Sequence, residues 1–138
     1  MAVSCVPVPK FSVIVAGSHG AGNYAMCGQA FDPRFTFCWP NAKISVMGGA
    51  QAADVITIVK NNQLKREGKE PLTQDVIDMM KQPIIDMFDK GSSAYAMTSC
   101  VGDDGIIDPR DTRDILGMAI SASLNSPAIT SGYGVFRM

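Results

Sequence analysis

The sequence lacks an excess of charge of either sign. Twelve lysines and arginines stand against 13 aspartates and glutamates, which leaves a formal net charge of −1 at pH 7. Such a chain has no surface field strong enough to gather nucleic acid or anionic lipid, so any bound anion must be held by local groups. It also lacks an apolar run near the roughly 20 residues that a membrane-spanning helix requires. We therefore expect a soluble chain with no nucleic-acid partner and no membrane segment.

Histidine and cysteine are scarce as well. His19 is the only histidine, and the four cysteines, at positions 5, 27, 38 and 100, show no CxxC spacing. This is not the ligand pattern of a zinc site, and we expect no metal. Scattered thiols and nine methionines are typical of a reducing compartment. The first residues show no leader peptide, but a leader could belong to sequence upstream, so both a cytoplasmic location and, in a eukaryote, the mitochondrial matrix stay open.

The first third of the chain predicts short strands separated by turns. Residues 11–16 (FSVIVA) are mostly apolar and β-branched and stop at a glycine, as in a buried parallel strand. After a glycine-rich turn, residues 23–31 are expected to form a helix. Residues 33–40 and 43–47 both predict short strands, because they are rich in aromatic or β-branched side chains.

The remainder predicts mainly helices. Residues 50–69 form a long helical pattern with a basic end, which suits a helix C-terminus. A second helix is expected to begin at the cap-like Thr73 and to be interrupted or kinked at Pro83. Three further segments follow: a helix over 94–100, a turn and short strand over 103–108, and a last helix over about 110–124 with Ile115, Met118, Ala119 and Ala122 on one face.

Alternating strands and helices make the chain α/β, with a short parallel sheet flanked by helices. At 138 residues it has the length of one modest domain. The first strand comes almost at once, with nothing upstream to form the rest of its sheet. A two- or three-stranded parallel sheet is a poor core by itself, so apolar surface should be left exposed.

Four stretches in order resemble a known family: GSHGAGNYAMCGQAF (17–31), DPRFTFCWPNAKISVMGGAQAADV (32–55), DDGIIDPRDTRDILGMAISASLNSP (103–127) and the terminal GVFRM (134–138). They are similar to the closing part of the carboxyltransferase (β) subunits of biotin-dependent acyl-CoA carboxylases, especially of the methylcrotonyl-CoA type. The resemblance implies a ClpP/crotonase-like fold built from ββα units. It also implies that residues 1–138 form a single, partial C-terminal carboxyltransferase domain.

The turn GSHGAG is the main candidate site. Between a strand and a helix, such a turn can present successive backbone N–H groups and the positive end of the helix to an anion. A tight turn and close packing would explain the glycines equally simply. The resemblance implies that the Gly20 and Ala21 amides are catalytic and stabilise the biotin oxygen that gains charge when carboxybiotin loses CO2. It implies further that the residues around them bind the cofactor, namely Gly17, Ser18, His19 and Gly22.

The role of His19 itself has two interpretations. As the only histidine it could act as a general acid or base. The family chemistry, however, asks for backbone amides at this turn, and related sequences carry aromatic residues at this position. We therefore expect His19 to be a wall or a hydrogen-bond partner of the site.

A second glycine-to-helix junction follows at VMGGAQAA. The resemblance suggests that Gly48, Gly49 and Ala50 shape the biotin or acyl pocket, and close packing of a helix on a sheet is the equal alternative.

Two further groups of residues are expected to be structural. The aromatic side chains of Phe35, Phe37 and Trp39 could line a cavity, but aromatic strands usually fill a core. Asp108 is expected to cap the last helix and Pro109 to open it, which gives the neighbouring acids a structural rather than a catalytic or metal-binding role.

The resemblance implies an enzyme that transfers a carboxyl group from carboxybiotin to an acyl-CoA. Its partners would be the acyl-CoA substrate, a biotin carboxylase and biotin carrier subunit, and further copies of itself in a homo-oligomer. Coenzyme A recognition falls in sequence that this chain lacks, so the isolated chain is expected to be inactive. Two alternatives stay open, a subunit of a biotin-dependent acyl-CoA decarboxylase and a non-catalytic interaction fragment.

Overall fold

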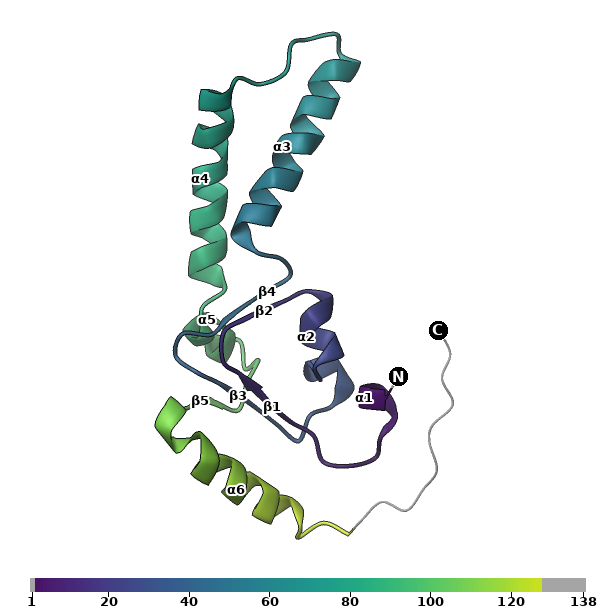
Figure 1. Ribbon diagram of the computed structural model, residues 1–138, viewed down its shortest axis with the longest axis vertical. Coiled ribbons are helices and arrows are strands. Elements are labelled where there is room, and N and C mark those ends of the chain that lie inside the picture. Colours follow the sequence, from purple (N-terminus) through teal and green to yellow (C-terminus); the bar gives the residue numbers. More distant parts are fainter. Residues whose placement is uncertain (1, 128–138) are drawn as a thin grey trace.

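The computed structural model describes residues 2–127 and consists of two small parallel sheets, a long helical hairpin and several shorter helices (Figure 1). In chain order the elements are α1 (Ala2–Cys5), β1 (Phe11–Ile14), β2 (Gly17–His19), α2 (Ala21–Ala25), the 3-10 helix η1 (Gln29–Phe31), β3 (Phe35–Cys38), β4 (Lys43–Ser45), α3 (Gly49–Arg66), α4 (Gln74–Gly91), α5 (Ala94–Ser99), β5 (Gly105–Ile106), the 3-10 helix η2 (Pro109–Asp111) and α6 (Thr112–Ser123). The prediction of an α/β chain with a short parallel sheet is confirmed.

The larger sheet has the order β1-β3-β5, and both of its pairings are parallel. Phe11 pairs with Phe35 and Val13 with Phe37. Because side chains alternate along a strand, these four lie on one face, where they pack with α6. The ring centroids of Phe11 and Phe35 lie 6.2 Å apart, and those of Phe35 and Phe37 lie 5.7 Å apart. Trp39 joins this cluster, so the predicted core role of the aromatic residues is confirmed.

The opposite face of the sheet is built around Cys38. This side chain is fully buried and packs with Ala42 and Ala94. Burial, and then the charge and hydrogen bond of Asp103, raise the pKa of the Cys38 thiol to about 12. The Thr98 hydroxyl donates to the same Asp103 carboxylate, with oxygen–oxygen distances of 3.0 and 2.9 Å. Asp103 thus has a structural role, because it links Thr98 of α5 to Cys38 of β3.

The first strand differs from its prediction in length and in burial. It ends at Ile14 rather than residue 16, and the chain then forms a separate strand, β2, which pairs in parallel with β4. A strand of three residues is too short to show a periodic pattern, and the strand that it pairs with lies 26 residues away. The sequence could therefore not have predicted β2. As the edge strand of its sheet, β1 has half-buried side chains throughout, so the expectation of a strand buried on both faces was wrong for the described residues.

The helix expected over 23–31 is confirmed only in part, because it is broken in the middle. The α2 helix begins at Ala21 and ends at Ala25, and a 3-10 turn over 29–31 follows. Cys27 has a φ of 67°, a left-handed conformation that ends the helix. The reversal brings the Cys27 carbonyl against β1, where it accepts a hydrogen bond of 2.9 Å from Ser12 Oγ.

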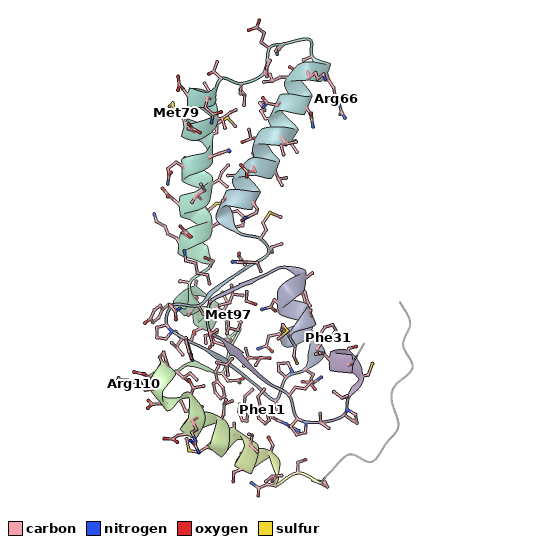
Figure 2. All side chains as sticks on the ribbon, in the orientation of Figure 1. Phe11, Phe31, Arg66, Met79, Met97 and Arg110 are labelled. Carbon is pink, nitrogen blue, oxygen red and sulfur yellow. The ribbon has the colours of Figure 1, made fainter. Side chains whose placement is uncertain are left out.

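The helices α3 and α4 form an antiparallel hairpin that projects away from the sheets (Figure 1). Figure 2 shows Arg66 and Met79 near its far end, well separated from Phe11 at the sheet. Small side chains, including Ala52 and Ala53, are buried along α3. The predicted interruption at Pro83 was wrong, because α4 runs through this residue. Thr73 does occupy the N-cap position, but its hydroxyl makes no capping bond.

The C-terminal part of the described chain agrees closely with its prediction. The helix over 94–100 and the short strand within 103–108 are both present. Asp108 caps the 3-10 turn that Pro109 opens, and its carboxylate accepts from the Arg110 amide at 2.9 Å. The Arg110 side chain, and then its backbone amide, lower the pKa of Asp108. The cap is therefore confirmed, although α6 proper begins at Thr112.

The inner face of α6 was only partly predicted. Ala119 is buried and Ile115 packs with the aromatic cluster, as expected. Leu116 joins them, whereas Met118 and Ala122 are exposed. Many large apolar side chains elsewhere are also exposed, including Val55, Ile58, Val59, Met79 and Met87 of the hairpin. No helix within residues 2–127 has the length and apolar character needed to cross a membrane.

Candidate functional site

The GSHGAG segment comprises the strand β2, Gly20 and the first two residues of α2. A glycine turn between a strand and a helix was expected here, but directly after the strand over 11–16 rather than with a separate strand in it. Gly20 has φ 54° and ψ −131°, a backbone conformation that favours glycine. A Cβ atom at this position would lie 2.7 Å from the Val46 carbonyl oxygen. Glycine is therefore required here both by the backbone conformation and by the close approach of the segment that follows β4.

The backbone amides of the turn are not equivalent. The Gly20 amide donates to the Ser45 carbonyl at 3.0 Å, and the Gly20 carbonyl accepts from the Asn23 amide at 3.1 Å. Within the described chain, the amides of Ala21 and Gly22 have no hydrogen-bond acceptor. Both residues are exposed at the start of α2. Of the two predicted donors, only Ala21 has an unengaged amide in this conformation, and Gly22, predicted as a lining residue, has another.

His19 is held by β4. The parallel register places His19 opposite Ser45, and the His19 Nδ1 atom lies 2.8 Å from Ser45 Oγ. Ser45 Oγ in turn donates to the Met47 carbonyl at 2.6 Å. A Cβ atom at Gly17 would lie 3.0 Å from His19 Nε2, so the imidazole ring packs over this glycine. Sequence reasoning did not identify Ser45, because its partnership with His19 depends on strand pairing.

Ser18 points to the other side of β2. Its hydroxyl accepts a hydrogen bond of 2.8 Å from the Asn23 side-chain amide. Ser18, Asn23 and Gly17 line an open cavity of about 500 Å³ that β1, α2 and the following turn border. Thr36 also lines it, and the Thr36 Oγ1 atom is buried with no hydrogen-bond partner among residues 2–127. Neither Thr36 nor Asn23 was identified from the sequence.

The second glycine junction is arranged differently. Gly48 has φ −65° and ψ 147°, which any residue can adopt, and it forms the N-cap of α3. A Cβ atom at Gly49 would lie 3.1 Å from Phe88 Cβ and 3.3 Å from Ile85 Cα, so this glycine allows α3 and α4 to approach. Ala50 is exposed. None of the three residues lines the 500 Å³ cavity.

The acidic residues of DDGIID have contacts of their own away from the turn. Asp104 accepts from the Thr36 amide at 2.7 Å, and Asp103 and Asp108 serve α5 and η2 as described. In the part of the chain that the structure describes, no three His, Cys, Asp or Glu side chains are grouped so that they could hold a metal ion.

Comparison with protein families matches residues 1–136 to the carboxyl transferase domain, and the chain therefore belongs to this family. Among curated proteins, it is 51% identical over 137 residues to the probable mitochondrial methylcrotonoyl-CoA carboxylase beta chain of Drosophila melanogaster, covering 99% of this chain and 24% of that protein. It is 49% identical to the biotin-dependent 3-methylcrotonyl-coenzyme A carboxylase beta1 subunit of Mycobacterium tuberculosis, covering 99% of this chain and 26% of that subunit.

A solved structure agrees with these relatives. The geranyl-CoA carboxylase beta subunit of P. aeruginosa matches with a TM-score of 0.78 and 39% identity, covering 99% of this chain and 25% of that subunit. The predicted resemblance and the carboxyltransferase-type fold are confirmed. The chain spans about a quarter of the length of each of these proteins.

Proposed function

We propose that the chain is a partial carboxyltransferase domain that takes part in carboxyl transfer from carboxybiotin to an acyl-CoA of the methylcrotonyl type. The observation that carries the proposal is the family match over residues 1–136, together with relatives at about half identity that are methylcrotonoyl-CoA carboxylase beta chains. The name of the Mycobacterium relative states a dependence on biotin. No feature of the turn favours the decarboxylation alternative over this one.

The turn fits the ureido oxygen of biotin. Biotin would supply the transferable carboxyl group, and the oxygen of its ring would gain negative charge as that group leaves. The Ala21 amide, which has no acceptor among the described residues, would donate to this oxygen from the start of α2. One fixed donor aimed at developing charge contributes about 3 to 4 kcal/mol to transition-state stabilisation. Gly22 offers a second amide beside it.

Gly20 would act mainly through its conformation. Its amide is engaged by the Ser45 carbonyl, so it could donate to a ligand only after leaving β4. It forms the N-cap of α2 in a left-handed conformation, and the first two amides of α2 have no internal acceptor, as at the start of any helix. Gly17, Ser18 and His19 would form the wall of the site, and Gly48, Gly49 and Ala50 would support it through the position of α3.

The proposed partners are an acyl-CoA, a biotin carboxylase and biotin carrier subunit, and further copies of the chain. The exposed apolar side chains of α3 and α4 and the unpaired edge of β1 support an assembly that covers them. For the isolated 138 residues we expect self-association by light scattering and no carboxylation of an acyl-CoA. A stable monomer with acyl-CoA-dependent turnover would contradict both expectations. The location proposed is the cytoplasm, or the mitochondrial matrix in a eukaryote; the name of the Drosophila relative describes that protein as mitochondrial.

The proposal can be tested by placing residues 1–138 in the Drosophila relative, in exchange for the quarter that they match. The chimera should carboxylate methylcrotonyl-CoA when assembled with its biotin-carrying partner. Ala21→Pro removes the amide hydrogen, and although its ring also fixes φ at this residue, proline is well tolerated at the first position of a helix. This variant should lower kcat about 100-fold or more, with little change in KM for the acyl-CoA.

Gly22→Ala is the matched control, because it keeps the amide and an added Cβ meets no atom within 4 Å. It should retain activity. An assembled, biotin-loaded chimera without activity would reject the proposed function. An active chimera that is indifferent to Ala21→Pro would reject only the role of the turn.

A further inference from the structure

The α3–α4 hairpin is apolar on one of its two broad sides. Because residues three or four positions apart share a helix face, Ala52, Ile56 and Val59 form one row along α3. This row lies about a quarter turn from the buried row of Ala53 and Thr57. Ile56 is 43% exposed and Val59 is 62% exposed, so the other residues of 2–127 leave this row largely open to solvent.

The α4 helix continues the same side. Its corresponding row consists of Val76, Met80, Pro83 and Met87. On each helix this row precedes the inner row by about a quarter turn, and because the two helices run in opposite directions, both rows lie on the same side of the hairpin. Val76 is 42% exposed and Met87 is 63% exposed. The two rows together are called the apolar side of the hairpin.

The opposite broad side is polar. Along α4 the Gln74 side-chain amide donates to Asp78 at 2.9 Å, and the Gln82 side-chain amide donates to Asp86 at 2.8 Å. A pair of helices with one apolar and one polar side is stabilised by a second layer packed on its apolar side.

The charges of the two helices indicate what this second layer is. The α3 helix has three basic residues and one acidic residue, whereas α4 has two basic and four acidic residues. Lys65 and Arg66 of α3, and Asp75 and Asp78 of α4, form no ion pair within residues 2–127. A second copy of the chain supplies both helices, so the basic α3 of each copy can lie beside the acidic α4 of the other. Two α4 helices side by side would repel each other.

The register within one hairpin also determines the register between two. Asp54 lies level with Lys81, because these two side chains form an ion pair of 2.6 Å. A twofold axis parallel to the hairpin keeps every residue at its own height. Ile56 of one copy is then level with Met80 of the other, and Val59 is level with Val76. Apolar residues therefore meet apolar residues along both rows.

We propose that two copies of the chain associate through the apolar sides of their hairpins and form a four-helix bundle, with α3 of each copy beside α4 of the other. The inference rests on the part of the proposed function that names further copies of the chain as partners. It assigns that association to a defined surface and a defined orientation.

The first test compares two neighbouring residues of α3 in the 138-residue chain. Val59→Lys places a charge on the apolar side, whereas Ile58→Lys places the same charge at a residue that is 58% exposed and lies toward the polar side. By sedimentation equilibrium, Val59→Lys should raise the dimer dissociation constant at least about tenfold, because the substitution occurs in both copies. Ile58→Lys should leave this constant within about threefold. Circular dichroism should show unchanged helix content in both variants, because both side chains are exposed.

The orientation is tested in dimers mixed from a 13C-labelled chain and an unlabelled chain. Isotope-filtered NOE spectra should connect the Ile56 methyl groups of one copy with the Met80 methyl group of the other. Contacts between the α3 helices of the two copies would overturn the proposed orientation.

The outcomes distinguish this inference from the rest of the proposed function. A monomer at all concentrations would overturn both the hairpin interface and the expected self-association. Self-association that Val59→Lys does not weaken, or that both lysine variants weaken equally, would overturn the hairpin interface and leave self-association through another surface. Carboxyl transfer is measured separately in the chimera, so its failure would not change the result of either test.

Discussion

Two strand-to-helix junctions of this chain look alike in sequence and differ in structure. The first, residues 17–22, comprises β2, Gly20 and the start of α2 and holds three glycines, and the second, residues 46–50, leads from β4 into α3 and holds two. At the first junction Gly20 adopts a left-handed φ and lies close to the Val46 carbonyl. At the second junction Gly48 is extended and Gly49 packs against α4. The comparison teaches that glycine after a strand can meet a strict backbone requirement or only permit helix packing, and that φ and neighbouring atoms decide which.

The largest loss of stability is expected for a substitution at the first junction. Gly20→Ala would place a methyl group 2.7 Å from the Val46 carbonyl and force a side chain into a left-handed conformation. We expect the free energy of unfolding to fall by about 2 to 4 kcal/mol, measured by urea denaturation. Gly22→Ala, with open space around its Cβ, should stay within about 0.5 kcal/mol. Equal effects of the two substitutions would mean that the first junction has no special requirement.

The second junction should respond to size rather than to backbone conformation. Gly49→Val would press against Phe88 and Ile85 of α4 and should cost about 1 to 3 kcal/mol. In Gly48→Ala the added methyl meets only the Gln51 side chain, which can turn away, so the change in stability should be small. Thermal unfolding of both variants checks this. A larger loss of stability for the Gly48 variant than for the Gly49 variant would contradict the role of Gly49 in the packing of α3 against α4.

The pH dependence of the free energy of unfolding tests whether the two junctions belong to one cooperative unit. Cys38 lies in the cluster with Ala42 and Ala94, next to β4 and α5. Its pKa is raised from 9.0 to about 12, so its stabilising contribution is complete below pH 9 and is lost as pH rises toward 12. We expect a loss of about 1 kcal/mol by pH 10 from this group. Cys38→Ala should show a correspondingly weaker dependence on pH.

Hydrogen exchange in the same pH range shows how far the effect extends. The amides of α2 and α3 should lose protection from hydrogen exchange together if packing against the Cys38 cluster stabilises both junctions. Loss of protection in only one of these helices would show that the junctions open independently.

The smallest contribution to stability is expected from the exposed ion pair between β4 and α4. Lys43 Nζ lies 2.7 Å from Asp89 Oδ1, and both side chains are more than half exposed. A double-mutant cycle with Lys43→Ala and Asp89→Ala should give a coupling free energy below about 1 kcal/mol. A much larger coupling would mean that this ion pair, rather than the packing of Gly49, holds the hairpin at the second junction.

Much of the fold could be predicted from local patterns. The long helices, the aromatic strand β3 and the Asp108 cap follow from residues that are close in sequence. The glycine-rich segment does lie at a strand-to-helix junction, whereas its binding role stays a prediction. The errors have physical causes: Pro83 is tolerated in a helix that packs along α3, and Cys27 ends α2 because the chain must return to β1.

By itself, the sequence determined the family, the element types and the glycine-rich turn, because each depends on residue identity or on spacing within a few positions. Only the tertiary structure decided that β2 is a separate strand, that the Gly20 amide is engaged by Ser45, and that Ser45 orients His19. These contacts join residues about 25 positions apart through parallel strand pairing. Since three-residue strands carry almost no periodic signal, their register and the hydrogen bonds that follow from it depend on packing in the folded chain.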